Sequence, residues 1–271
     1  MVVTLIAAAL AAASVPAASA PAPRIPDADP AIWVVNDQDT VIFLFGTFHA
    51  LDGKTDWFND EVRTAFASSD ELVLETMVPD ASAPPPRPAT DTATPSGVSG
   101  VTFAPPASLL ASTRMAISAG KAKGLNVRYG ADAVLRQAAE YAGKGVGGLE
   151  SFDFQLGMFA RLPGSTQARA GKSEDPNAKE SMGLLMGQMQ TAWNRGDPGI
   201  FTAMLEQMRA SSPETYKMMF TERNTNWAEW IANRLQKPGT VFVAVGTGHL
   251  VGHDSVQAKL AHLGVHSARI N

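Results

Sequence analysis

Cysteine is absent from this chain of 271 residues. The protein therefore has no disulfide bond, no thiolate nucleophile and no zinc or iron–sulfur centre held by cysteine. Any metal ion has to be bound by histidine, aspartate, glutamate or asparagine side chains, or by water. An excess of positive charge is also absent, because 22 Lys and Arg residues face 26 Asp and Glu residues, for a net charge of −4. A surface that binds nucleic acid is normally basic, so we expect no nucleic-acid partner.

Two further features are missing. The glycine-rich stretch at residues 143–148 lacks the Walker pattern and leads out of a helical segment, so it does not predict a phosphate-binding loop. Beyond the N-terminus, no apolar run is long enough to cross a bilayer. The composition itself, with 45% hydrophobic and 18% charged residues, is that of a globular protein.

The N-terminal segment has the pattern of a signal peptide. Residues 2–15 are apolar, Pro16 interrupts the run, and residues 18–20 read Ala-Ser-Ala, which fits a cleavage site between small residues. The run is short for a membrane span. We therefore expect residues 1–20 to be removed and residues 21–30 to form the tail of a periplasmic or secreted protein without a stable membrane span.

The remaining sequence, residues 31–271, is expected to form one α/β domain. Strands are predicted at residues 31–35, 40–45, 71–77, 125–129, 145–150, 240–245 and 265–270, and helices include 57–68, 131–142, 178–192, 200–208, 213–235 and 254–263. The methionines in the segment 178–192 recur at helical spacing, which indicates core packing. Residues 79–106 are crowded with Pro, Ala, Ser, Thr and Gly, and this composition predicts a flexible insertion.

One motif occurs twice. The segments VIFLFGTFHAL, from Val41, and VFVAVGTGHLV, from Val241, each combine an apolar strand with Gly-Thr-X-His. Glycine lets the chain turn sharply and approach a ligand. The turn places His49 and His249 at the carboxyl end of a strand, where α/β proteins form their sites. We therefore expect two related halves around a shared cleft, each with a strand–Gly-Thr-X-His–helix unit, and a helical segment between them.

Two glutamates follow strand-like runs. Glu75 ends an apolar strand, where an isolated carboxylate is costly unless it is paired, bound to a metal or protonated. Glu150 lies where a strand turns into a helix, and capping that helix is the alternative to a role in the site. Together with His49 and His249, these glutamates form a ligand set suited to a divalent Mn, Co, Zn or Fe ion. Such an ion leaves a position for water and lowers the pKa of that water.

A further polar group lies within the predicted helix 213–235. Glu222, Arg223 and Asn224 are consecutive there. In one interpretation Glu222 and Arg223 act in the cleft, where Arg223 holds a carboxylate or stabilises an oxyanion. In the other interpretation they form an ordinary salt bridge. His253 lies four residues after His249, but the glutamate that follows the first histidine of the zincin motif is missing.

In combination, these motifs resemble the TraB/GumN family, to which the Wnt-cleaving TIKI proteases are related. The resemblance runs from about Trp33 to the C-terminus. Besides the two Gly-Thr-X-His motifs, it is carried by Leu74-Glu75, Gly148-Leu149-Glu150 with Gln155, Trp193-Asn194-Arg195-Gly196-Asp197, and Glu222-Arg223-Asn224 with Trp227. It implies an α/β fold with two halves around a cleft, and relatives that include erythromycin-esterase-like hydrolases and haem-linked ChaN proteins.

The leading hypothesis is a metal-dependent hydrolase that acts on a peptide or another small periplasmic substrate. In this hypothesis His49, Glu75 and His249 hold the ion or act as general base toward its water, and Glu150 is a further ligand. Arg223 and Glu222 are catalytic residues beside the ion. One alternative is a non-catalytic periplasmic factor in exopolysaccharide biosynthesis or export, and another is a haem- or metal-binding protein.

Overall fold

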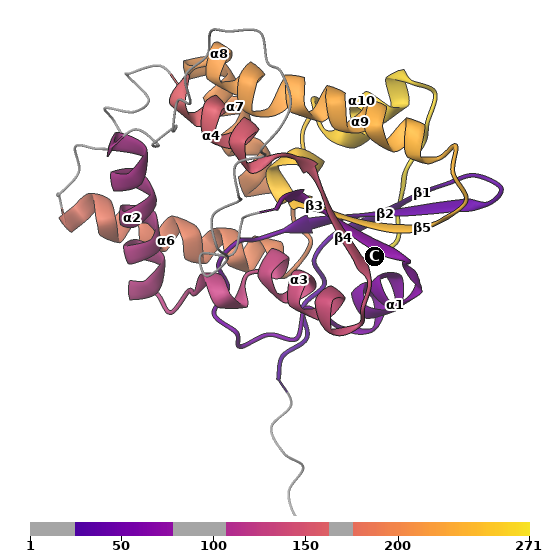
Figure 1. Cartoon of the computed structure of the whole chain (residues 1–271). Coiled ribbons are helices and arrows are strands. Elements are labelled where there is room, and N and C mark those ends of the chain that lie inside the picture. Colours follow the sequence, from indigo (N-terminus) through magenta and orange to yellow (C-terminus); the bar gives the residue numbers. More distant parts are fainter. Residues whose placement is uncertain (1–24, 78–106, 163–175) are drawn as a thin grey trace, which may run out of the picture.

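The computed structural model describes residues 25–77, 107–162 and 176–271. In these residues one sheet has the strand order β4-β3-β5-β2-β1-β6 (Figure 1). Its strands are β1 (Ile32–Asn36), β2 (Thr40–Thr47), β3 (Glu71–Thr76), β4 (Gly145–Glu150), β5 (Gly239–Gly246) and β6 (Ala268–Arg269). Strands β2 to β5 are parallel, whereas β1 pairs antiparallel with β2 and β6. The expected signal peptide at 1–20 and insertion at 79–106 lie outside the described residues.

Helices cover both faces of the sheet, which confirms the α/β class (Figure 1). They are α1 (Asp60–Ser68), α2 (Ala107–Ala122), α3 (Ala131–Tyr141), α4 (Phe152–Ala160), α6 (Pro176–Trp193), α7 (Gly199–Ser211), α8 (Pro213–Tyr216), α9 (Glu222–Arg234) and α10 (Val256–His262). Helices α1 and α3 lie on one face, α9 and α10 lie on the other, and α2 pairs with α6 beside the sheet. None of the helices in the described ranges combines the length and hydropathy needed to cross a bilayer.

Alternation of side chains along the central strands builds a core on each face. On β5, Val241 and Val243 pack in the cluster that contains Trp227 and Ile231 of α9. The residue between the two valines, Phe242, points to the opposite face, in the cluster that contains α1. Burying each large apolar side chain contributes about 1.5–3 kcal/mol. The two cores therefore hold the parallel strands firmly, and with them the strand ends that carry the polar residues.

The two strands that carry the Gly-Thr-X-His motifs are neighbours. Strands β2 and β5 pair in parallel, with Gly46 opposite Val245 and Thr47 opposite Gly246. The two motifs therefore lie side by side at one edge of a single sheet. The two Gly-Thr-X-His units are joined directly by strand pairing within this sheet.

Three local predictions differ from the structure. The segment 125–129 was predicted as a strand, but Val127–Tyr129 forms a 3₁₀ turn because the Asn126 side chain accepts a hydrogen bond from the Arg128 amide. The predicted helix 213–235 is divided into α8 and α9 by a π-helical segment at Lys217–Thr221. The last strand spans only Ala268–Arg269.

The part of the expected N-terminal tail that is described packs against the domain. The amide of Ala28 donates to the carbonyl of Asp56 at 3.2 Å, and the amide of Asp56 donates to the carbonyl of Pro26 at 2.9 Å. Ala28 is almost fully buried. Residues 26–30 therefore belong to the folded domain instead of forming a free tail.

Candidate functional site

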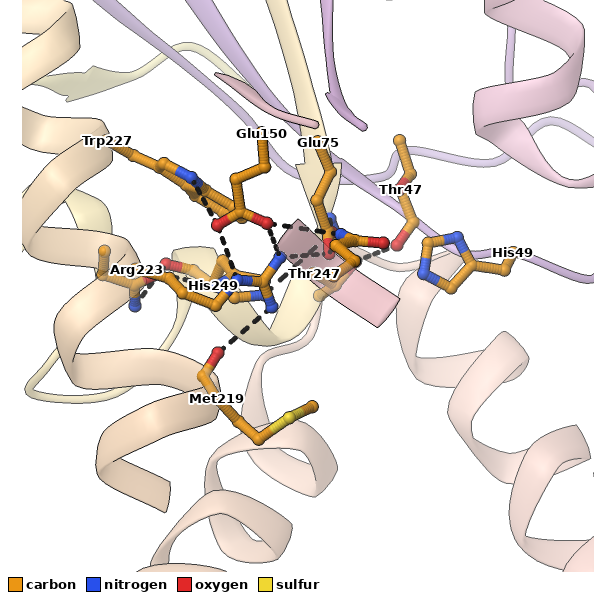
Figure 2. A network of polar contacts seen from close by, with 12 residues as sticks. Thr47, His49, Glu75, Glu150, Met219, Arg223, Trp227, Thr247 and His249 are labelled. Atoms are coloured by element: carbon orange, nitrogen blue, oxygen red, sulfur yellow. Dashed lines mark hydrogen bonds and ion pairs between the residues drawn. The ribbon is translucent and has the colours of Figure 1, made fainter. Parts of the chain in front are cut away.

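The carboxyl ends of four parallel strands bring the predicted polar residues to one place. His49 follows β2, Glu75 lies near the end of β3, Glu150 ends β4 and His249 follows β5. Arg223 reaches the same edge from α9 (Figure 2). This is the edge at which open α/β sheets bind their ligands.

Three of these side chains surround the α-carbon of Gly246. A β-carbon at this position would lie 3.4 Å from Oε2 of Glu75, 3.6 Å from Nε2 of His49 and 3.7 Å from Cδ2 of His249. The amide of Gly246 also donates to Oε2 of Glu75 at 3.2 Å. A side chain at position 246 would occupy the space between the three groups, and glycine leaves that space open.

The two Gly-Thr-X-His turns also hold each other. Oγ1 of Thr247 donates to the carbonyl of Thr47 at 2.9 Å. A β-carbon at Gly46 would lie 3.0 Å from Oγ1 of Thr247, so glycine permits the close approach of the two turns. The indole nitrogen of Trp193, at the end of α6, donates to the carbonyl of Gly46 at 2.7 Å. These bonds fix the two turns, and hence His49 and His249, relative to each other.

Arg223 is buried between two carboxylates. Its Nε and one terminal nitrogen donate to Glu150 at 2.7 and 2.8 Å, and that terminal nitrogen also donates to Glu75 at 2.6 Å. The other terminal nitrogen donates to the carbonyl of Met219 at 3.2 Å and lies 3.3 Å from Nε2 of His249. A guanidinium has five N–H groups, and these contacts use all of them. Arg223 therefore holds the protein's own carboxylates and keeps no donor for a substrate oxyanion.

Glu75 is an ionised carboxylate at neutral pH. Burial alone would raise the pKa of Glu75, but the neighbouring His249 and Arg223 reverse this effect and lower the pKa to about 2. At neutral pH the cations beside Glu75 are Arg223 and the protonated His49, and both favour the ionised form. Nε2 of Gln155 donates to Oε1 of Glu75 at 3.0 Å, so Arg223 and Gln155 share this oxygen and Oε2 faces Gly246.

His249 is buried and its tautomer is set by Asn224. The Asn224 nitrogen donates to the carbonyl of Asp254 at 2.8 Å, which turns the Asn224 oxygen toward Nδ1 of His249 at 2.6 Å. Nδ1 therefore carries the proton, and Nε2 presents its lone pair to the site. Burial lowers the pKa of His249 to about 3, and Arg223 adds to the effect. His249 is consequently a neutral acceptor.

His49 has the opposite charge state. Its Nδ1 lies 2.9 Å from Oδ1 of Asp132, in the first turn of α3. The negative charge of Asp132 raises the pKa of His49 to about 9, against an opposing effect of desolvation. The side chain of His49 is 66% exposed, and its Nε2 faces the space beside Gly246. In the absence of other ligands, the site therefore contains a protonated His49, a neutral His249 and an ionised Glu75.

A model of the TraB/PrgY/gumN family matches residues 31–96 and 94–269. The chain belongs to this family. Neither a curated protein nor a solved structure matches it. The match covers every polar residue of the site and confirms the resemblance on which the sequence-based expectation of the family rested.

In this TraB/PrgY/gumN protein, two of the candidate site residues, Glu150 and Glu222, do not lie where the sequence suggested. Both oxygens of Glu150 face donors, because Trp227 and Arg223 contact Oε1 and Arg223 and Gln155 contact Oε2. Glu150 therefore lies in the Arg223 network, and the alternative role as helix cap is filled by Ser151. Glu222 lies outside the cluster, where it is exposed and 3.7 Å from Lys217.

The structure also assigns roles that the sequence did not reveal. Asp132 and Asn224 each hold Nδ1 of one site histidine. The signal for Asp132 was weak: a glycine followed by a helix whose first turn contains an aspartate. That glycine, Gly130, is required because its α-carbon approaches the carbonyl of His49 so closely that a β-carbon would lie 2.2 Å from the oxygen.

The spacing of the site residues can be compared with what a metal ion requires. In the described ranges, no three His, Asp or Glu side chains stand close enough together to hold an ion as they are. Nε2 of His249 lies 4.0 Å from Oε2 of Glu75. Two ligands of a tetrahedral ion with bonds of about 2 Å lie roughly 3.3 Å apart, so an ion would require these two side chains to close by roughly 0.7 Å.

Proposed function

We propose that this TraB/PrgY/gumN protein is a metal-dependent hydrolase whose ion is held by His49, Glu75 and His249. The observation that carries the proposal is the convergence of Glu75 Oε2, His49 Nε2 and the His249 ring on the α-carbon of Gly246. The three groups come from three neighbouring strands and leave between them a space that a single β-carbon would fill.

The donor chemistry of these residues fits a divalent ion such as Mn, Co, Zn or Fe. Two imidazoles and a carboxylate are common ligands of such ions. Histidines that bind metal usually donate their second ring nitrogen to an oxygen acceptor, which fixes the tautomer. Asp132 and Asn224 provide that acceptor for His49 and His249 respectively. When bound, the ion would supply a water of lowered pKa and a Lewis acid for the scissile bond.

The chain's own residues prepare the site for this chemistry. Arg223 keeps Glu75 ionised, so that a carboxylate and not a carboxylic acid faces the space beside Gly246. Asn224 keeps the lone pair of His249 on Nε2, the nitrogen that contacts Arg223 at 3.3 Å, so an ion bound there would have to replace this contact. His49 would have to lose the proton on Nε2 to hold an ion, because a metal competes with protons for the same nitrogen.

A peptide-library assay tests the proposed function. Purified protein should cleave the library, lose this activity after treatment with a chelator, and regain it when one of the four metals is added. Glu75→Gln should abolish the activity, whereas Glu229→Gln, a matched change at an exposed glutamate of α9, should not. Full activity in the chelator would rule out metal dependence. A complete lack of cleavage and of bound metal would favour the non-catalytic exopolysaccharide factor.

We further propose that the protein is exported. The proposal of export is supported by the apolar run at residues 2–15, with Pro16 and the small residues at 18–20. Expressed with its native N-terminus, the protein should begin near Pro21 and be recovered in the periplasmic or secreted fraction. Retention of Met1 on cytoplasmic protein would contradict export.

A further inference from the structure

Two cavities meet at His49 and Glu75. One has a volume of about 330 Å³ and reaches toward α7, and the other has a volume of about 390 Å³ and reaches toward α3. Both are lined by Thr47, His49, Glu75 and Phe159. A substrate bond placed at the proposed catalytic residues would therefore have one part in each cavity.

The first cavity, which we call the Met/Phe cavity, has an apolar wall made by one face of α7. Phe201, Met204, Leu205 and Met208 lie on this face, at the spacing of successive helical turns. The wall continues on α6 with Met189. Methionine side chains adapt their shape to apolar ligands, which makes such a wall suited to binding as well as to packing.

The opposite wall is formed by the π-helical segment that interrupts the predicted helix 213–235. Met219 and Phe220 of this segment line the Met/Phe cavity. The Phe220 ring lies 4.9 Å from the His249 ring, and a β-carbon at Gly248 would lie 3.1 Å from it. Isolated π-helical turns occur frequently at functional sites. Here the turn places an aromatic ring directly beside a proposed ligand of the ion.

The second cavity has a different character. Besides the four shared residues, it is lined by the polar side chains of Thr76, Asp132, Arg136 and Gln155. Asp132 and Arg136 have partners of their own, His49 and Glu140. The second cavity is also lined by the apolar residues Leu74, Ala133 and Ala244, so a group there meets more polar side chains than a group in the Met/Phe cavity but is still mainly in contact with carbon. The two sides of the proposed catalytic residues differ in polarity.

We infer that the Met/Phe cavity binds a bulky apolar side chain of a peptide substrate, adjacent to the scissile bond, while the continuation of the peptide lies in the second cavity. This inference rests on the proposed hydrolase function. The cavity volume lies at the lower end of the range of about 300–1,000 Å³ that is usual for ligand sites. The cavity shares His49, Glu75 and His249 with the catalytic site, so an apolar side chain bound there lies next to the reacting bond.

A binding experiment tests the cavity without requiring catalysis. The protein is labelled with ¹³C at its methionine methyl groups and titrated with N-acetyl-phenylalaninamide while the NMR signals are followed. N-acetyl-glycinamide is the comparison probe. The phenylalanine probe should shift the methyl signals of Met204, Met208 and Met219 but not that of Met115 on α2. Met204→Glu should abolish the response, whereas Leu184→Glu, at an exposed apolar residue outside the cavity, should not. Equal responses to both probes would overturn the inference.

The specificity of cleavage provides a second test of the Met/Phe cavity. In the peptide library, cleavage should occur next to Leu, Met or Phe and rarely next to Gly or Ser. Met204→Glu should reduce cleavage at the apolar sites about tenfold, which corresponds to the loss of one buried apolar contact. Met208→Glu provides a second variant in case Met204→Glu is poorly folded. Cleavage without apolar preference contradicts the inference, and failure of the hydrolase proposal alone leaves the methyl shifts intact.

Discussion

Nδ1 of His249 lies 2.6 Å from the side-chain oxygen of Asn224. The orientation of this amide is not arbitrary, because its nitrogen donates to the carbonyl of Asp254, which can only accept. The pair therefore fixes which ring nitrogen of His249 is protonated, and leaves Nε2 as the acceptor that faces Arg223.

The first prediction concerns this tautomer. In metal-free protein, ¹H–¹⁵N NMR at pH 7 should show His249 neutral and protonated at Nδ1. Asn224→Leu should cost about 1–3 kcal/mol of stability, because it leaves the buried Nδ1–H group without an acceptor. It should also produce a mixture of tautomers. An Nε2-protonated ring in the wild-type protein would show that Asn224 does not orient it.

The second prediction concerns Arg223, which neutralises two carboxylates in a buried place. Arg223→Met should lower the free energy of unfolding by about 3–5 kcal/mol, because Glu75 and Glu150 then lack their cation. Urea unfolding measures this loss. The matched change Arg234→Met, at a less buried ion pair with Glu71, should cost about 1 kcal/mol or less. Equal losses in the two variants would mean that the Arg223 network is no stronger than a surface pair.

The third prediction concerns acid stability. The pKa of His249 is lowered from 6.5 to about 3 in the folded protein, so between these values the unfolded chain binds more protons. Stability must then fall as the pH decreases, by up to about 1.4 kcal/mol per pH unit. Urea unfolding in chelator between pH 6 and pH 5 should show this slope, and His249→Gln should reduce it.

Two other site residues do not interfere in that window. Glu75 has its pKa lowered from 4.5 to about 2, so its stabilisation is present above pH 4.5 and is lost as the pH falls toward 2. His49 has its pKa raised from 6.5 to about 9, so its stabilisation is complete below pH 6.5 and is lost as the pH rises through 9. If the unfolding free energy of His249→Gln falls as steeply between pH 6 and pH 5 as that of the wild type, a group other than His249 causes the acid sensitivity.

The fourth prediction concerns Gly130, which brings α3 against the turn that carries His49. Gly130→Ala places a β-carbon 2.2 Å from the carbonyl oxygen of His49, and such overpacking costs about 1–3 kcal/mol or more. It should also move Asp132 away and bring the pKa of His49 back toward 6.5, which NMR titration measures. Gly187→Ala, in α6 with open space around it, should instead stabilise the protein by up to about 1 kcal/mol. If the pKa of His49 stays near 9 in Gly130→Ala, the close approach at Gly130 is not what holds Asp132 against His49.

Much of the site is predictable from the sequence, because the relevant residues follow apolar strands. The apolar runs of β2 and β5 stop at Gly-Thr, which indicates where each strand ends, and the strand ends position His49 and His249. What the sequence does not contain is the order of strands in the sheet. The direct pairing of β2 with β5 depends on contacts about 200 residues apart in the chain, which local sequence does not reveal.

The partners of the charged residues were harder to predict for the same reason. Glu150 ends a strand just as Glu75 does, and only the position of Arg223 on α9 shows that both carboxylates face one guanidinium. Glu222, the neighbour of Arg223 in sequence, points away because successive residues of a helix lie on different faces. The role of Asp132 depends on the docking of α3 against the His49 turn, which local sequence does not encode.

The central claim is that His49, Glu75 and His249 hold one ion and that hydrolysis depends on it. Metal stoichiometry and library cleavage, measured on the same preparations of wild type, His49→Ala and His249→Ala, test it most directly, with circular dichroism as the control for folding. The account predicts about one ion per chain in the wild type, and a joint loss of metal and activity in each folded variant. Full metal content and full activity in both histidine variants would contradict it.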